Sequence, residues 1–95
     1  MPETLRLDKW LWFARFFKTR SLAASVIAAG EVRLNGAVAG KPAQGVRAGD
    51  ELVFPTGKRR RRVVVLALGE RRGPAPEARA LYREEEPPPP EDEWG

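Results

Sequence analysis

Apolar side chains recur at helical spacing near the start of this chain, and this spacing restricts how its first part can fold. Five of them stand at positions i, i+3, i+4, i+7 and i+10: Leu7, Trp10, Leu11, Ala14 and Phe17. Such a pattern is typical of a helix with one core-facing stripe, which we predict over residues 7–18. Trp12, Phe13 and Phe16 fall largely on the opposite side of this helix. They either stack on the bases of a nucleic acid or pack beneath the C-terminal part of the chain, and we favour packing.

A second helix is predicted directly after the first. Thr19 or Ser21 can cap its N-terminus by accepting a hydrogen bond from a free backbone N–H group. Apolar residues continue at helical spacing as far as Ile27, and Gly30 tolerates the left-handed conformation in which helices often end. The pattern therefore indicates two short helices joined by a tight turn.

The middle of the chain favours short strands. A hairpin is predicted over residues 32–39, because Asn35-Gly36 at its centre suits the positive φ angles of a type I′ turn. Residues 50–54 and the β-branched run 63–68 are two further predicted strands. The order of helices followed by strands indicates an α+β fold.

The C-terminal part divides into a short helix and a tail. Residues 77–83 suit a helix because Pro76 lies near its first turn. Residues 84–95 contain four consecutive prolines among acids, which is typical of an extended, disordered tail. We therefore expect one domain over residues 1–83, with two N-terminal helices packed on a small, mostly antiparallel sheet. Its core motif spans about residues 5–54.

The charge of the chain is unevenly distributed. Six of the 13 acids lie in residues 84–95, which contain no base, so residues 1–83 hold 17 bases against seven acids, a net charge of +10. A field of this sign attracts polyanions and speeds their encounter with the protein. Nucleic acid is the partner that this distribution favours over a merely solvated basic surface.

Two residue types are missing from the sequence. Cysteine and histidine are both absent, which excludes disulfides, thiolate or imidazole metal sites, and mechanisms that need a Cys nucleophile or a His base. We expect no catalytic residue, no metal and no cofactor. The apolar run 63–68 is too short to cross a bilayer, and cations interrupt the apolar residues of positions 1–20, unlike a signal peptide. A cytoplasmic monomer without membrane contacts is expected.

Several spaced elements resemble the S4-type RNA-binding domain (αL motif), named after a small-subunit ribosomal protein. In chain order they are Arg6-Leu7-Asp8-Lys9-Trp10-Leu11, Arg15, Lys18-Thr19-Arg20-Ser21, Gly30-Glu31-Val32-Arg33-Leu34-Asn35-Gly36 and Gly49-Asp50. Residues 10–23, 71–78 and 81–82 resemble more closely the fifteen-kilodalton heat-shock protein family of bacteria. This resemblance covers roughly residues 5–83. It implies a stress-related protein that binds ribosomal RNA or tRNA on the large ribosomal subunit, notably a subunit that still carries a stalled nascent chain.

The residues themselves agree with an RNA-binding role. Guanidinium groups grip phosphate oxygens bidentately, Lys acts as a mobile point charge, and a helix N-terminus offers free N–H groups to an anion. Two helices joined by a tight turn can bring such groups to one side: Arg6, Lys9, Arg15, Lys18, Thr19, Arg20 and Ser21. Further along the chain, four residues would extend this surface: Arg33, Asn35, Gly36 and Lys41. It would recognise the shape and backbone of structured RNA rather than its sequence.

Some of these residues also have a structural interpretation. Arg15 and Arg20 could instead pair with Asp8 or Glu31, and we interpret Asp8 itself as a structural partner for a neighbouring Arg. The basic run 58–62 is expected to add nonspecific phosphate contacts through Arg59 and Arg60, although such runs also occur in solvated loops.

The chain departs from the heat-shock family after Leu81-Tyr82. Family members continue into a basic helical extension, whereas this chain continues into the acidic segment 84–95. A tail of this charge could fold back on the basic face and compete with weak RNA binding.

The function we predict is a ribosome-associated RNA-binding factor that acts in the rescue or recycling of large subunits carrying a stalled chain. One alternative is a quality-control adaptor that stabilises peptidyl-tRNA, and another is a stand-alone RNA-recognition module that partners an RNA-modifying enzyme. Weak DNA binding through the same cations is a further alternative, but no predicted helix presents an obvious array of base-reading side chains.

Overall fold

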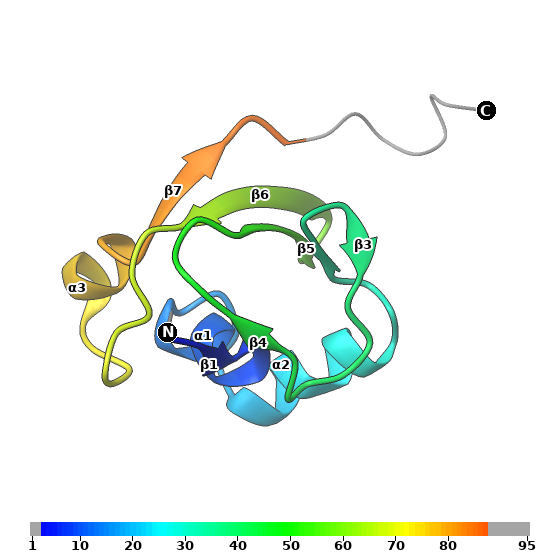
Figure 1. The fold of residues 1–95 in the computed structure, drawn as a ribbon, viewed down its shortest axis with the longest axis horizontal. Helices are drawn as coiled ribbons and strands as arrows, with labels where there is room; N and C mark the ends of the chain where they lie inside the picture. The colour runs from blue at the N-terminus through cyan, green and yellow to red at the C-terminus, as the bar shows by residue number, and fades with distance from the viewer. Residues whose placement is uncertain (1–2, 88–95) are drawn as a thin grey trace.

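Residues 3–87 are described by a computed structural model, in which two helices pack against a sheet (Figure 1). In chain order the elements are β1 (Leu5–Arg6), α1 (Leu7–Phe13), α2 (Arg20–Ala28), β2 (Arg33–Leu34), β3 (Ala37–Val38), β4 (Gly45–Val46), β5 (Glu51–Thr56), β6 (Arg59–Val65), α3 (Ala75–Arg79) and β7 (Tyr82–Glu85). The main sheet is antiparallel with the strand order β3-β2-β5-β6-β7, and β1 pairs separately with β4. The predicted α+β architecture is confirmed.

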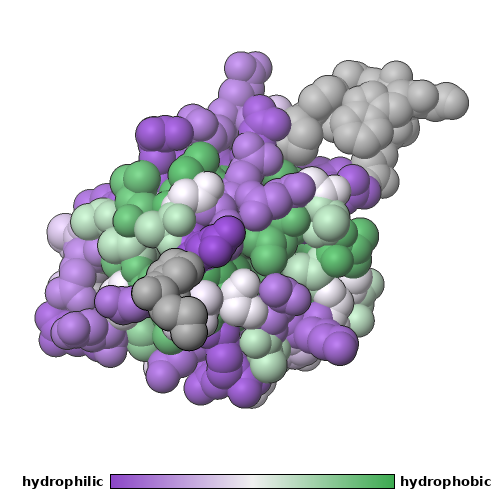
Figure 2. All heavy atoms as spheres, viewed as in Figure 1, coloured by the Kyte–Doolittle hydropathy of each residue, from purple (hydrophilic) through white to green (hydrophobic). Residues whose placement is uncertain are grey.

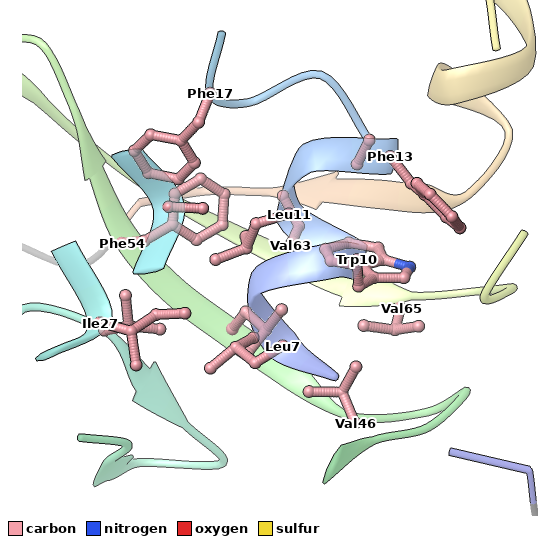
Figure 3. Packing of buried hydrophobic residues seen from close by; sticks show 14 of the residues in the cluster. Leu7, Trp10, Leu11, Phe13, Phe17, Ile27, Val46, Phe54, Val63 and Val65 are labelled. Carbon is pink, nitrogen blue, oxygen red and sulfur yellow. The ribbon is translucent and has the colours of Figure 1, made fainter. Parts of the chain in front are cut away.

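The core lies between the helices and the main sheet (Figure 3). Trp10 is fully buried at its centre, and the indole Nε1 donates a hydrogen bond to the backbone oxygen of Ala67 at 2.9 Å. All five residues of the predicted stripe are buried, together with apolar residues of α2 and the strands: Leu7, Trp10, Leu11, Ala14, Phe17, Ile27, Val46, Phe54, Val63 and Val65. The predicted core face of the first helix is therefore confirmed.

Helix α1 is shorter than the spacing predicts, because it ends before Arg15. Arg15 adopts a left-handed conformation with φ of 65°, and the N–H group of Phe16 donates back to Leu11 O at 3.2 Å. A side chain other than glycine in this conformation costs about 1–2 kcal/mol. The reversal places Phe17 in the core although it lies beyond the helix.

The aromatic residues on the other side of α1 pack instead of facing solvent, as the sequence analysis favoured. The ring of Phe16 lies 4.7 Å from that of Phe54 and 4.6 Å from that of Tyr82. Phe13 is buried, and Trp12 is half-buried with the guanidinium of Arg72 at 5.7 Å from its ring. Phe16, which lies just beyond α1, joins this part of the chain to β5 and β7.

Helix α2 and the following hairpin match the sequence pattern closely. Thr19 caps α2 by accepting a hydrogen bond from the N–H group of Leu22 at 3.0 Å, and Gly30 has φ of 79° just past the helix end. Asn35 and Gly36 have φ of 51° and 88°, which are the positive angles of the predicted turn between β2 and β3.

The basic run belongs to a strand, although it was predicted to lead into one. Strand β6 begins at Arg59 and ends at Val65, whereas the β-branched content predicts residues 63–68. Its partner β5 continues through Pro55, which lies opposite Arg60. Proline is tolerated there because β2 pairs only with Leu52 and Val53, so β5 has an open edge at Pro55.

The C-terminal helix is also shorter than predicted, and a strand follows it. Helix α3 ends at Arg79, and β7 then pairs antiparallel with β6. Glu84 and Glu85, which were predicted to belong to the tail, lie in β7, which pairs with β6, and Glu84 forms an ion pair with Arg61 across the strands. Residues 88–95 of the predicted tail lie outside the described residues.

The aromatic cluster makes the fold sensitive to the loss of one ring. Replacing Phe54 by Ala should lower the free energy of unfolding by about 3–5 kcal/mol, because the cavity removes the contacts of Phe54 with Phe16 and Phe17. Denaturant unfolding followed by circular dichroism measures this loss. The exposed Val38 provides the control, since Val38→Ala should change stability by less than about 0.5 kcal/mol. Equal effects of the two substitutions would contradict the packing described.

Candidate nucleic-acid interface

A buried carboxylate holds two arginines together where α1 and α2 begin. The side chain of Asp8 is only 4% exposed, whereas those of Arg6 and Arg20 are 50% and 41% exposed. Arg6 donates to Asp8 through Nε and Nη2, each at 3.1 Å, and Arg20 donates through Nε at 3.4 Å. Residues 6 and 20 belong to different elements, so Asp8 determines how far apart these two guanidinium groups lie.

The same contacts keep Asp8 ionised. Burial raises the pKa of its carboxyl group, but the hydrogen bond from Arg6, the charges of Arg20 and Arg6, and the N–H group of Lys9 together hold that pKa below its ordinary value. Asp8 in turn raises the pKa of Arg6 through its hydrogen bond and its charge. The structural interpretation of Asp8 is supported by this geometry, and Arg20 has the alternative partner that the sequence analysis considered.

The loop before β4 lies against the start of α1. Leu7 N–H donates to the backbone oxygen of Gln44 at 2.8 Å, and Asp8 N–H donates to that of Pro42 at 3.2 Å. The exposed Lys41 belongs to this loop, because Gln44 N–H donates to its carbonyl oxygen. The structure therefore places Lys41 near Asp8 and its two arginines, although Lys41 and Asp8 are more than 30 residues apart in sequence.

The N-terminus of α2 lies next to Asp8, because Arg20 is the first residue of this helix. Thr19 uses its hydroxyl oxygen as the cap, so its side chain has a structural role. Lys18 and Ser21 are exposed on either side of it. The N-terminus of a helix carries a partial positive charge and favours an anion. We use the term helical face for this group: Arg6, Lys18, Arg20, Ser21 and Lys41.

Two of the predicted cations on the first helix have other surroundings. Lys9 is half-buried with its ammonium 5.6 Å from the centre of the Phe13 ring. Arg15 is exposed, and its Nε donates to the backbone oxygen of Gly73 at 2.6 Å. This bond supports the left-handed conformation at the end of α1. Arg15 therefore has a structural role in holding the segment before α3, and phosphate binding by it stays a prediction.

A second buried carboxylate supports the hairpin turn. Asp50 accepts a hydrogen bond from the side-chain amide of Asn35 at 3.1 Å and another from the N–H group of Arg47 at 3.0 Å. The amide oxygen of Asn35 accepts from the N–H group of Glu51 at 2.9 Å. Both the nitrogen and the oxygen of the Asn35 amide thus form hydrogen bonds. These bonds hold the turn that presents the exposed Gly36.

Arg47 is an exposed cation beside this turn that the sequence pattern did not predict. Its Nε lies 4.0 Å from Asp50 Oδ1. Gly49-Asp50 was noted only as part of the motif. A buried acid next to a turn needs a donor nearby, and that requirement is the signal that points to Arg47.

The remaining predicted residues lie on the main sheet and not at the start of the helices. Arg33 is in β2, and Arg59 and Arg60 begin β6. Because side chains alternate along a strand, Arg59 and Arg60 point to opposite faces of the sheet. The structure therefore does not gather all the predicted cations on one surface.

Within residues 3–87, no group of acids is arranged to hold a metal ion, and no helix is long and apolar enough to cross a membrane. In the view of Figure 2, hydrophilic residues cover much of the rim of the molecule, and hydrophobic residues gather towards its middle. What the helical face offers chemically is two guanidinium groups held by Asp8, two exposed ammonium groups and a helix N-terminus. Such donors bind phosphate oxygens.

Comparison with known proteins identifies the family to which the chain belongs. A family model for the S4 domain matches residues 5–52, which include α1, α2 and the hairpin. Heat shock protein 15 of Escherichia coli is 48% identical over 80 residues, which are 84% of this chain and 59% of that protein. The trimeric structure of Vibrio cholerae heat shock protein 15 superposes with a TM-score of 0.82 at 43% identity, covering 87% of this chain and 83% of that one. The chain therefore belongs to the S4 domain family, and within it to the heat shock protein 15 group.

A second kind of relative matches a shorter stretch. The RQC P-site tRNA stabilizing factor of Listeria innocua is 44% identical over 57 residues, which are 60% of this chain and 61% of that protein. This chain thus spans about three fifths of the length of the curated relatives it matches.

The ionised state of Asp8 predicts how acid affects the fold. A carboxyl group whose pKa is lowered by folding stabilises the protein above its unfolded pKa of about 3.9, and this contribution is lost as the pH falls through the folded pKa. The Asp8→Asn substitution should cost about 1–3 kcal/mol at pH 7, because a neutral amide replaces the charged acceptor of the hydrogen bonds from Arg6 and Arg20. It should also flatten the loss of stability below about pH 4.

Chemical denaturation at several pH values measures both effects. Glu70→Gln removes an exposed acid and serves as the matched control, which should leave the pH dependence close to that of the wild type. An Asp8→Asn protein with the acid sensitivity of the wild type would show that Asp8 is not the group responsible.

Proposed function

We propose that this protein binds structured RNA, namely ribosomal RNA or tRNA on the large ribosomal subunit, and acts in the rescue or recycling of subunits that carry a stalled nascent chain. The observation that carries the proposal is the pair of guanidinium groups held by Asp8 beside the N-terminus of α2. Donors held in place before binding lose less conformational freedom when they contact phosphates. The names of the relatives support the ribosomal setting and the link to stress.

A quality-control role is the second candidate. The Listeria innocua relative is named for stabilising P-site tRNA, and its match covers 57 residues of this chain. The two candidates share one binding surface and differ in their partners. Affinity purification of the tagged protein from cells separates them, because rescue predicts large subunits alone and the adaptor role predicts a quality-control protein on the same subunits.

The protein acts by binding rather than catalysis in this proposal, and it works in the cytoplasm, where ribosomes translate. The sequence analysis expects a monomer, whereas the Vibrio cholerae relative was solved as a trimer. Sedimentation equilibrium of the full chain decides between these states. Weak DNA binding through the same cations stays a prediction, and a duplex DNA competitor in the binding assays tests it.

Crosslinking followed by sequencing of the bound RNA tests the ribosomal assignment. The proposal predicts that crosslinks concentrate at a few positions of large-subunit RNA or tRNA, and that they increase when translation is stalled. Crosslinks spread over messenger RNA in proportion to its abundance would contradict the proposal.

The role of Arg20 can be measured with purified components. Replacing Arg20 by Gln should weaken binding to a structured RNA hairpin and flatten the plot of log K against log[salt] by about 0.7–0.9, because one phosphate contact is lost. Fluorescence anisotropy over a range of salt concentrations gives the slope. Arg79→Gln on α3 removes the same charge from an exposed position outside the helical face and is the matched control.

Equal slopes for Arg20→Gln and the wild type would show that Arg20 pairs with Asp8 and makes no phosphate contact. Arg15→Gln distinguishes the two roles of Arg15 in the same assay. A structural role predicts a lower unfolding midpoint with an unchanged salt slope, and a phosphate contact predicts a flatter slope.

A further inference from the structure

Arg72 binds the backbone at two points of the connection between α1 and α2. Its Nε donates to Trp12 O at 3.1 Å, and its Nη2 lies 3.5 Å from Phe17 O. We use the term interhelical turn for residues 14–19, which join the two helices. The segment that carries Arg72, drawn in yellow in Figure 1, leads from β6 to α3. A side chain from a distant part of the chain therefore holds the interhelical turn.

Arg72 supplies a cation that the end of α1 lacks. The last carbonyl groups of a helix have no partner within it and carry a partial negative charge. The last turn of α1 contains no basic residue, and Trp12 O accepts from the N–H group of Arg15 at 3.0 Å. Arg72 fills the second acceptor position of the same oxygen, and its guanidinium lies 5.7 Å from the centre of the Trp12 ring. Backbone and ring together fix the direction of this half-buried side chain.

Local sequence does little to determine the interhelical turn. Residues 14–19 contain neither glycine nor proline, the residues that most often set the course of a turn. Aromatic rings of this turn pack on Phe54 and anchor its middle. Its backbone is held by Arg72 and by Gly73, whose carbonyl oxygen accepts from Arg15 Nε at 2.6 Å. The course of the backbone is therefore set from the segment after β6.

The interhelical turn leads directly into the helical face. Lys18 and Thr19, the cap of α2, are its last residues. The first residue of α2, Arg20, contacts Asp8 through one bond of 3.4 Å, which is long for a hydrogen bond between charged groups. This bond joins the ends of two side chains, so it does not by itself fix the backbone at the N-terminus of α2. Arg72 supplies that constraint through the backbone.

We propose that Arg72 is a positioning residue for RNA binding, which fixes the interhelical turn and thereby the place of Lys18 and of the α2 N-terminus relative to Asp8. It acts through the backbone and needs no contact with RNA. The identity of the ligand rests on the proposed function, whereas the positioning rests on the hydrogen bonds of Arg72. The affinity of the helical face then depends on a residue beyond residue 52, where the match to the S4 model ends. Lysine cannot replace Arg72, because an ammonium group lacks the planar fork that reaches two oxygens.

Binding of a structured RNA hairpin by two variants of the full chain tests this role. Arg72→Lys keeps the charge and loses the fork, whereas Arg72→Gln loses both. Each should bind the hairpin about three- to tenfold more weakly than the wild type, with an unchanged slope of log K against log[salt], because phosphate contacts are misplaced rather than removed. Fluorescence anisotropy at several salt concentrations gives both quantities, and circular dichroism confirms that each variant is folded under the assay conditions.

Amide signals of the free protein show whether the turn moves. The two-dimensional ¹H–¹⁵N spectrum should show shifted signals for residues 18–22 in both Arg72 variants. Arg71→Lys is the matched control, because Arg71 is exposed and its guanidinium contacts Glu77 on the surface. This control should leave the signals of residues 18–22 and the affinity for the hairpin unchanged.

A double-mutant cycle with Lys18 separates positioning from a loss of stability. If Arg72 acts through the place of Lys18, Arg72→Lys should weaken binding less in a Lys18→Gln protein than in the wild type. Two residues that act independently would give additive effects. The cycle uses the variant that conserves the charge, so it decides the question even if Arg72→Gln does not fold.

Several results would overturn the role of Arg72. Wild-type affinity of the Arg72→Lys protein is one, since the fork would then be dispensable. A slope flattened by about 0.7–0.9 in Arg72→Gln alone is another, because it would mean a direct phosphate contact. Unmoved amide signals or additive effects in the cycle would do the same. Failure of the proposed function would look different, because the wild type would then bind no hairpin while the amide signals would still report the turn.

Discussion

The packing of α1 on the main sheet is the interaction on which the rest of the structure depends. Trp10 fills the space between them without any exposed surface, and its indole N–H group is bound by Ala67 O. Burying an aromatic side chain of this size contributes a large share of the stability of a 95-residue chain. With α1 held in this position, Asp8 at its start is oriented towards Arg20 of α2. The arrangement of the helical face is thus a consequence of core packing.

Buried acids give the basic surface its order. Asp8 and Asp50 are the buried charged residues of the described part of the chain, and each binds groups from two segments. Removing a carboxylate from water is costly, and its partners must repay the cost with hydrogen bonds. In return the acids restrict the arginines and the hairpin turn to defined positions. Without these acids, the neighbouring cations would repel one another and their side chains would not be held in defined positions.

Local patterns predicted those elements that depend on local physics. The stripe from Leu7 to Phe17, the Thr19 cap and the Asn35-Gly36 turn were all predictable, because each signal lies within a few residues of its effect. The end of α1 was not, since the left-handed Arg15 is supported by Gly73, which is 58 residues away. The strand at Arg59–Arg62 could not be predicted either, because arginine has little strand preference and β5 and β7 determine the pairing.

The same distinction between signals from nearby residues and contacts between distant segments applies to the candidate site. Residue types and their order indicated which cations are candidates for phosphate binding, and the alternative partner of Arg20 was identified. Their distribution between the helical face and the sheet depends on strand alternation and register, which become defined only when distant segments meet. Arg47 was missed because its link to the turn runs through Asp50, which binds both Asn35 and the N–H group of Arg47 only in the folded chain.

The contacts between the first part of the chain and the segment after β6 determine which residues must be present together for the domain to fold. Trp10 binds Ala67, Arg15 binds Gly73, and Arg72 donates to the backbone oxygen of Trp12 at 3.1 Å. All three reach beyond residue 52, where the match to the family ends. The portion that the S4 family model covers is therefore smaller than the portion that must assemble together. Grafting only the smaller portion onto another protein would leave the aromatic side of its first helix without its cover.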